Sequence, residues 1–165
     1  MAKYNIYTDG SSRGNPGKGG WGMVVMNEDE TEVLYTDSNF EDNVTNNRME
    51  LKAMICALGY AESSPNDQFV IYSDSAYVVN SITQWAVNWA KNNWTKKDKK
   101  PIQNLIYIQE AYKLYQKLAF KVCILQVPGH SNVIGNELAD CLATNNINQF
   151  NKLCEEYGIK YIGED

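Results

Sequence analysis

Residues 3–27, "KYNIYTDGSSRGNPGKGGWGMVVMN", place a glycine-rich turn between two strand-like segments. The side chains of residues 3–9 alternate with a period of two, which is typical of a strand. Two more strand-like runs, at 20–27 and 32–39, follow at hairpin spacing. The sequence therefore predicts three antiparallel strands at the start of the chain.

Beyond these strands the sequence predicts helices that alternate with further strands. From Asn46 the apolar residues recur at helical spacing, with Thr45 or Asn46 as the N-cap. The remaining predicted elements are a strand at 68–74, a helix or two short helices at 75–94, a helix at 101–118 that opens with Pro101, a strand at 119–129 and a helix at 136–147. This order indicates an α/β fold, a mixed sheet with helices packed on it, while residues 147–165 give no clear signal.

Length and composition restrict the class of protein. The 165 residues suit a single domain, 1–165, and no apolar run is long enough to span a bilayer. The N-terminus does not have the pattern of a signal peptide, so we expect a cytoplasmic protein. The four cysteines lie singly, without the spacing of zinc ligands. The net charge of −5 argues against coating nucleic acid by bulk charge, but residues 91–100 hold five of the fifteen basic residues.

Two aspartates follow a repeated pattern at the ends of predicted strands. "IYTDGS" at 6–11 and "IYSDSA" at 71–76 each place Tyr, a hydroxyl residue and then Asp at the end of a strand. If the two strands are parallel neighbours, Asp9 and Asp74 lie together at the carboxyl edge of the sheet, where open α/β sheets bind ligands. The alternative is that each aspartate caps a turn or a helix.

Glu50 and Asp140 give signals of different strength. Glu50 falls on the apolar, core-facing arc of its predicted helix, where a carboxylate is costly to bury unless it is paired or binds a cation. An early position in the helix would also let Glu50 interact with the helix dipole. Asp140 lies away from the apolar stripe of its helix, so its pattern alone indicates a solvated residue.

Acidic side chains gathered at a sheet edge, without a cysteine or histidine cluster, suit Mg²⁺ or Mn²⁺ rather than zinc. Two such ions about 4 Å apart catalyse in-line displacement at phosphorus. The sequence therefore favours phosphodiester chemistry.

Four motifs together resemble type 1 ribonuclease H. They are "YTDGSSRGNPGKGGWG", "TNNRMELKA", "IYSDSAYV" and "VPGHSNVIGNELAD", in the order and spacing of that family, and the match spans about residues 4–146. The resemblance implies the ribonuclease H fold, in which a five-stranded mixed sheet, three antiparallel strands and then two parallel ones, is flanked by helices. It also implies endonucleolytic hydrolysis of the RNA strand of an RNA–DNA hybrid, leaving a 5′ phosphate and a 3′ hydroxyl.

The same resemblance assigns the catalytic residues. It implies that Asp9 bridges two Mg²⁺ ions, for which Mn²⁺ can substitute. Asp140 would then hold the ion that activates water, and Glu50 with Asp74 the ion near the leaving 3′ oxygen. His130 is the single histidine. Its pattern alone is that of a structural or exposed loop residue, whereas the resemblance implies a role in proton transfer or product release.

The resemblance also implies residues that contact the hybrid. Asn15 would contact the hybrid from the glycine-rich loop, and Thr45 would hold a phosphate of the DNA strand. Asn46 and Asn47 would sense the 2′-hydroxyls that distinguish RNA from DNA. Asn46 has the alternative role of a helix cap.

Residues 84–101, "QWAVNWAKNNWTKKDKKP", resemble the basic protrusion that some family members carry. We expect its lysines to contact phosphates: Lys91, Lys96, Lys97, Lys99 and Lys100. Trp85 is a further candidate contact, although Trp85 and Trp89 are four residues apart and their spacing favours packing within a helix.

Three positions depart from the family pattern. Ala76 stands where many relatives have Gln, Asn132 where Gly is frequent, and Arg13 adds a charge to the first loop. A non-catalytic nucleic-acid-binding module on the same fold is the alternative function, although all four carboxylates are present. We expect a monomer that binds an RNA–DNA hybrid and no membrane.

Overall fold

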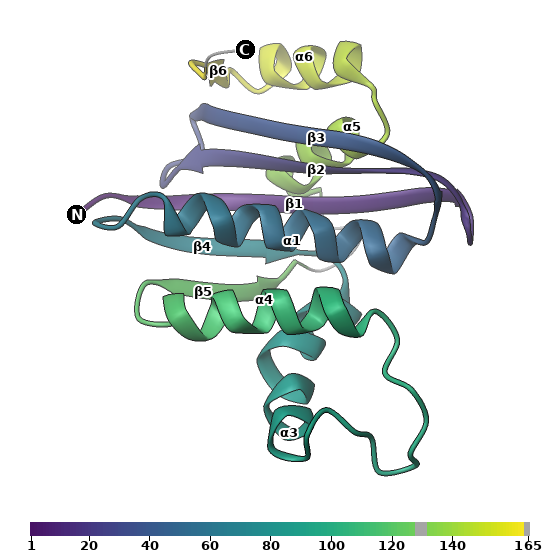
Figure 1. Cartoon of the computed structure of the whole chain (residues 1–165). Helices are drawn as coiled ribbons and strands as arrows, with labels where there is room; N and C mark the ends of the chain where they lie inside the picture. The colour runs from purple at the N-terminus through teal and green to yellow at the C-terminus, as the bar shows by residue number, and fades with distance from the viewer. Residues whose placement is uncertain (128–131, 164–165) are drawn as a thin grey trace.

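The computed structural model describes residues 1–127 and 132–163, and its centre is a mixed sheet (Figure 1). The strands are β1 (Lys3–Gly14), β2 (Gly17–Asn27), β3 (Glu32–Val44), β4 (Gln68–Ser73), β5 (Val122–Gln126) and β6 (Lys160–Tyr161). Their order across the sheet is β5-β4-β1-β2-β3-β6. β1, β2 and β3 are antiparallel, and β4 and β5 continue the sheet in parallel with β1, as predicted.

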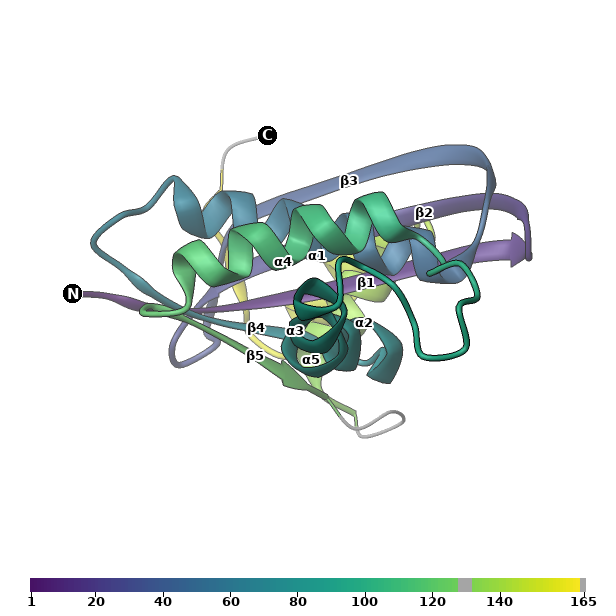
Figure 2. The ribbon, with the colours of Figure 1, turned by 60° about the horizontal axis from the view of Figure 1, so that its bottom comes forward.

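Helices cover both faces of this sheet (Figures 1 and 2). On one face lie α1 (Asn46–Glu62) and α4 (Leu105–Leu118). The opposite face is covered by α5 (Ile134–Ala143), and α6 (Ile147–Glu156) packs beside it. After β4 the chain forms α2 (Ala76–Asn80), a π-helical turn η1 (Ser81–Trp85) and α3 (Ala86–Lys91). Among the described helices, none combines the length and the hydropathy that crossing a bilayer requires.

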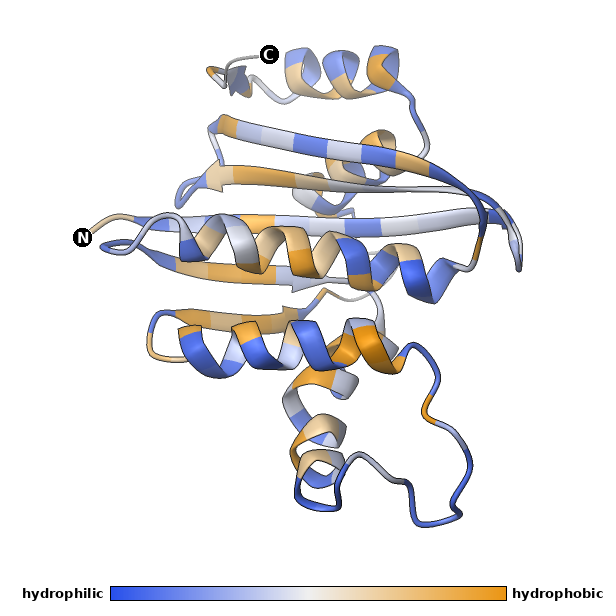
Figure 3. Ribbon diagram, in the orientation of Figure 1, coloured by the Kyte–Doolittle hydropathy of each residue, from blue (hydrophilic) through white to orange (hydrophobic). Residues whose placement is uncertain are grey.

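Alternating residues of the strands build two cores. Ile6 packs with residues of α1 and α4, whereas its neighbour Tyr7 packs with residues of α5 and α6. β4 and β5 are predominantly hydrophobic, while the loop between α3 and α4 is hydrophilic (Figure 3). This loop therefore projects from the sheet rather than packing into it.

The C-terminal tail differs from the sequence-based expectation. Residues 147–165 gave no clear signal, but α6 buries Phe150 and Cys154 in the second core, and Ile159 follows them there. β6 then pairs in parallel with β3, so the sheet has six strands rather than five. A two-residue strand is too short to show a period in the sequence.

The prediction that Pro101 opens a helix is wrong. α4 begins at Leu105, and Asn104 before it has a left-handed backbone with φ of 58°. A left-handed residue interrupts a right-handed helix, so α4 does not extend back to Pro101. At α1 the choice between the two caps is settled, because Thr45 Oγ1 accepts a hydrogen bond of 3.2 Å from Arg48 N.

Candidate active site

Asp9 and Asp74 lie side by side, as the repeated pattern predicts. β1 and β4 are parallel neighbours whose last paired residues are Thr8 and Ser73. Asp9 follows Thr8 in the sequence, and Asp74 follows Ser73. The sheet therefore brings both carboxylates to the point where β4 ends.

A close contact between β1 and α1 adds Glu50 to this pair. A Cβ atom at Gly10 would lie 2.3 Å from Glu50 N and 2.4 Å from Met49 C, so only glycine lets the helix approach the strand this closely. Glu50 is the fifth residue of α1, beyond the first turn in which the helix dipole acts. The dipole therefore does not account for its position.

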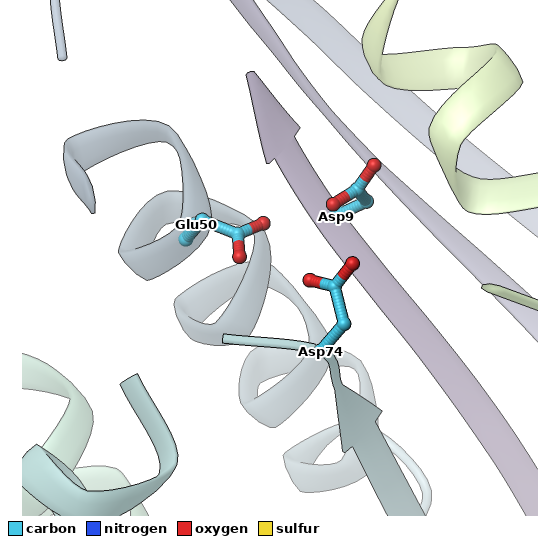
Figure 4. A group of neighbouring side chains, drawn as sticks. All are labelled: Asp9, Glu50 and Asp74. Atoms are coloured by element: carbon cyan, nitrogen blue, oxygen red, sulfur yellow. The ribbon is translucent and has the colours of Figure 1, made fainter. Parts of the chain in front are cut away.

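The three carboxylates converge from β1, from α1 and from the end of β4 (Figure 4). One carboxylate oxygen from each of Asp9, Glu50 and Asp74 lies within 4.8 Å of the others. Asp9 and Glu50 are each only 7% exposed, and Asp74 is half-buried. Three acidic groups thus share one poorly solvated position.

This arrangement disfavours negative charge on the carboxylates. Burial, then the charge of Asp74 and the neighbouring carboxyl group of Asp140, raises the pKa of Asp9 to about 8. Burial, followed by the charges of Asp9 and Asp74, raises the pKa of Glu50 well above its ordinary range. Asp9 and Glu50 therefore each have a reason to hold a proton unless a positive charge is supplied.

The cluster fits a divalent metal ion. Glu50 Oε1 is buried and has no hydrogen-bond partner among the residues that the structure describes. An unpaired carboxylate oxygen in such a position is costly, and a cation relieves that cost. The donors are all oxygen atoms, which Mg²⁺ and Mn²⁺ prefer.

Asp140 lies next to this cluster but outside the tight group of three. It is on α5, is exposed as its pattern predicted, and its carboxyl group is close enough to that of Asp9 to help raise the pKa of Asp9. Gly22, which pairs with Asp9 across β1 and β2, lets α5 approach, since a Cβ there would lie 2.7 Å from Ala139 O. Helical periodicity carried no signal of this contact. His130 lies outside the described residues.

Asn15 and Asn46 interlock beside the cluster. Asn46 N donates a hydrogen bond of 3.1 Å to Asn15 Oδ1, and Ser12 N donates one of 2.6 Å to Asn46 Oδ1. Asn46 is thus a link to β1 rather than the helix cap. Asn47 is exposed. Sequence patterns do not reveal the contact of Ser12, because its partner is 34 positions away and no local pattern reports such a contact.

The basic protrusion keeps most of its lysines exposed. Lys96 is half-buried, and the others are exposed. Lys96 and Lys97 line two cavities of about 570 Å³ each, one shared with Lys99 and Lys100 and the other with Trp85. No ion pair joins these lysines to a carboxylate within the described part of the chain.

Trp85 and Trp89 pack together, as their spacing predicted. Their ring centroids are 6.0 Å apart, and the ring centroid of Tyr77 lies 6.3 Å from that of Trp85. Trp85 is nevertheless 39% exposed, so part of its ring is free to contact a ligand.

Comparison with known proteins assigns the family. Residues 1–148 match RNase H. Ribonuclease H of Rickettsia felis is 42% identical over 143 residues, which cover 86% of this chain and 89% of that protein. Ribonuclease H of Orientia tsutsugamushi is 45% identical over 140 residues, which cover 85% of this chain and 79% of that protein.

The fold also matches a solved structure. LC9-RNase H1, a type 1 RNase H with the type 2 active-site motif, superposes with a TM-score of 0.74 at 25% identity, and the match covers 98% of this chain and 87% of that one. The chain therefore belongs to the ribonuclease H family, with the fold of that family and the activity of an endoribonuclease.

Proposed function

We propose that this protein cleaves the RNA strand of RNA–DNA hybrids by two-metal-ion catalysis, leaving a 5′ phosphate and a 3′ hydroxyl. The observation that carries the proposal is the convergence of Asp9, Glu50 and Asp74 within 4.8 Å at a buried position. Structural ion pairs relieve buried charge with a cationic side chain. Here the charged side chains that act on Asp9 and Glu50 are themselves acidic, so the cost of burying their negative charge is left to bound cations to offset.

Four carboxylates would hold the two cations: Asp9, Glu50, Asp74 and Asp140. Asp9, at the centre, would contact both. Glu50 and Asp74 would hold one of them, and Asp140, on the opposite side of Asp9, would hold the other. Two Mg²⁺ ions supply a lowered pKa for the attacking water and charge neutralisation at the leaving 3′ oxygen. His130 would assist proton transfer or product release.

The proposed hybrid contacts lie on two surfaces beside the carboxylates. Asn15, Asn46 and Asn47 are exposed next to the cluster and would contact 2′-hydroxyls and the groove. Thr45 would hold a phosphate of the DNA strand. The lysines of the basic protrusion, with Trp85, would contact the backbone further along the hybrid. We expect the chain to act as one domain and as a cytoplasmic monomer.

The test is cleavage of a hybrid labelled on its RNA strand, in Mg²⁺ and in EDTA, beside duplex DNA and duplex RNA. We expect cleavage of the hybrid's RNA alone, lost in EDTA and in Asp9→Asn. Asp29→Asn, which removes an exposed carboxylate in the turn after β2, is the matched control and should cleave normally. A folded protein that binds the hybrid but cleaves it in neither Mg²⁺ nor Mn²⁺ would instead be a nucleic-acid-binding module.

A further inference from the structure

Three polar side chains near the carboxylate cluster accept hydrogen bonds from backbone N–H groups with their oxygen atoms. Asn15 Oδ1 accepts from Asn46 N at 3.1 Å, and Asn46 Oδ1 accepts from Ser12 N at 2.6 Å. Thr45 Oγ1 accepts from Arg48 N at 3.2 Å. Together these bonds tie the β1–β2 hairpin to the start of α1.

The backbone decides which way the two amides face. A backbone N–H can only donate, so it must meet the carbonyl oxygen of an Asn side chain and not its NH₂ group. Ser12 adds its hydroxyl, whose Oγ lies 3.0 Å from Asn46 Oδ1 and 2.6 Å from Gly14 O. The amides of Asn15 and Asn46 are therefore held in one orientation, each with its oxygen inward.

The groups that Asn15, Asn46 and Thr45 leave for a ligand are hydrogen-bond donors. Asn15 and Asn46 are exposed, and among the described residues neither Nδ2 group donates a hydrogen bond. The hydroxyl hydrogen of Thr45 is also free to donate, since its oxygen is the acceptor for Arg48 N. Ala76, two residues after Asp74, offers only a methyl group.

We infer that the outward NH₂ groups of Asn15 and Asn46 discriminate against guanine in the part of the groove of the hybrid that faces them. The inference rests on the proposed hybrid cleavage. Adenine N3, pyrimidine O2 and the ribose 2′-oxygen are acceptors and match the two NH₂ groups. Guanine adds an N2 amino donor on the same edge, and a donor facing a donor leaves both unpaired.

Base analogues isolate the amino group. Replacing one guanine at a time by hypoxanthine removes the N2 amino group and weakens the base pair. Replacing adenine by 2,6-diaminopurine adds the amino group and strengthens the pair. Both changes also alter the stability of the base pair, so an effect of stability is recognised because it appears along the whole hybrid, whereas an effect of the amino group is confined to the positions that face Asn15 and Asn46.

We expect at least one position near the cleaved bond where kcat/KM rises roughly 3- to 10-fold on loss of the amino group and falls similarly on its gain. If no position, tested as guanine in one hybrid and as adenine in another, responds in opposite directions to loss and gain of the amino group, the inference is overturned. Absence of cleavage of every hybrid would instead refute the proposed function.

Asn46→Asp assigns the effect to its residue. The variant keeps an oxygen for Ser12 N but replaces the outward NH₂ with an acceptor, so the preference should vanish or reverse towards the amino group. Asn15→Asp provides the same test on the hairpin. Asn43→Asp, an exposed substitution that adds the same charge nearby, should lower binding while keeping the wild-type analogue ratio. Wild-type ratios in both test variants would overturn the assignment.

Discussion

The core holds together the three elements that position the acidic cluster: Asp9 is on β1, Glu50 on α1, and Asp74 directly after β4. The five lysines of the basic protrusion lie instead on a short helix and a hydrophilic loop. The carboxylates are buried or half-buried and within 4.8 Å of one another. Most of the lysines are exposed and form no ion pair with a described residue. We therefore expect the acidic cluster to depend on position to within about 1 Å, and the protrusion to depend on its summed charge. Single changes should therefore have large effects in the first region and small ones in the second.

The largest expected effect is the loss of Asp9. Because Asp9 is the carboxylate that would contact both cations, Asp9→Asn should lower kcat/KM by roughly three or more orders of magnitude. A lysine-to-glutamine change in the protrusion should change it by a small factor. Initial cleavage rates of a labelled hybrid provide the measurement, and comparable losses in the two regions would break the distinction between them.

A smaller but still large effect is expected from position alone, with every carboxylate kept. Gly10→Ala places a Cβ 2.3 Å from Glu50 N, so α1 must move away from β1 and carry Glu50 with it. A displacement of about 1 Å near the reaction costs up to roughly 100-fold in rate. We expect a loss of that order in a protein whose circular dichroism is unchanged.

Gly59→Ala is the matched control for this variant. Gly59 is also in α1, but a Cβ there meets nothing within 4 Å. It should raise the melting temperature, since alanine is favoured over glycine within a helix by up to about 1 kcal/mol. Activity equal to wild type in Gly10→Ala would show that the cluster tolerates a shift of the helix.

The raised pKa of Asp9 predicts a pH-dependent stability in EDTA. Its ordinary pKa is 3.8, and its folded value is about 8, so between these values the native state holds a proton that the unfolded chain releases. This contribution to stability is complete below pH 3.8 and is lost as the pH rises towards 8. Asp9→Asn removes this loss of stability at high pH. Its melting temperature in EDTA should be several degrees above that of the wild type at pH 8, and the difference should be smaller at pH 5.

Mg²⁺ should reverse that order. A cation that binds only the native cluster stabilises the wild type in proportion to the logarithm of its concentration, and Asp9→Asn should gain much less. Thermal melts at pH 8 across a Mg²⁺ titration test this. A gap between the proteins that is independent of both pH and Mg²⁺ would contradict the electrostatic cause.

The smallest effect on turnover is expected in the protrusion. Replacing Lys96, Lys97, Lys99 and Lys100 with glutamine should weaken hybrid binding and reduce the slope of log K against log salt by roughly 3, with kcat nearly intact. The control changes four exposed lysines elsewhere to glutamine: Lys3, Lys113, Lys152 and Lys160. Equal slopes for the two quadruple variants would mean that only net charge matters.

The sequence predicted those parts of the fold and site that local patterns encode. The repeat that ends in Asp9 and Asp74 worked because parallel strands in register place equivalent residues side by side. Glu50 could be found because one helical period identifies the core-facing arc. The helical pattern did not indicate Asp140, which only the resemblance to the family assigned, since its approach to Asp9 depends on how closely α5 packs on Gly22.

Contacts between distant segments explain the remaining differences. The bond between Ser12 and Asn46 joins residues on different elements, and the pairing of β6 with β3 depends on where α6 directs the chain. The π-helical turn η1 lies within a stretch that has ordinary helical spacing. Such features are decided by packing, which a periodic pattern does not contain.

The tail after α5 has a practical consequence for anyone who expresses or fuses this protein. The family match ends at residue 148, but Phe150, Cys154 and Ile159 lie in the second core, and β6 covers the edge of β3. A chain cut after residue 148 would keep Asp9, Glu50, Asp74 and Asp140. It would, however, expose an apolar surface and an unpaired strand edge, the combination that promotes aggregation. A purification tag or a fusion partner at this end therefore belongs beyond the whole tail, residues 147–165.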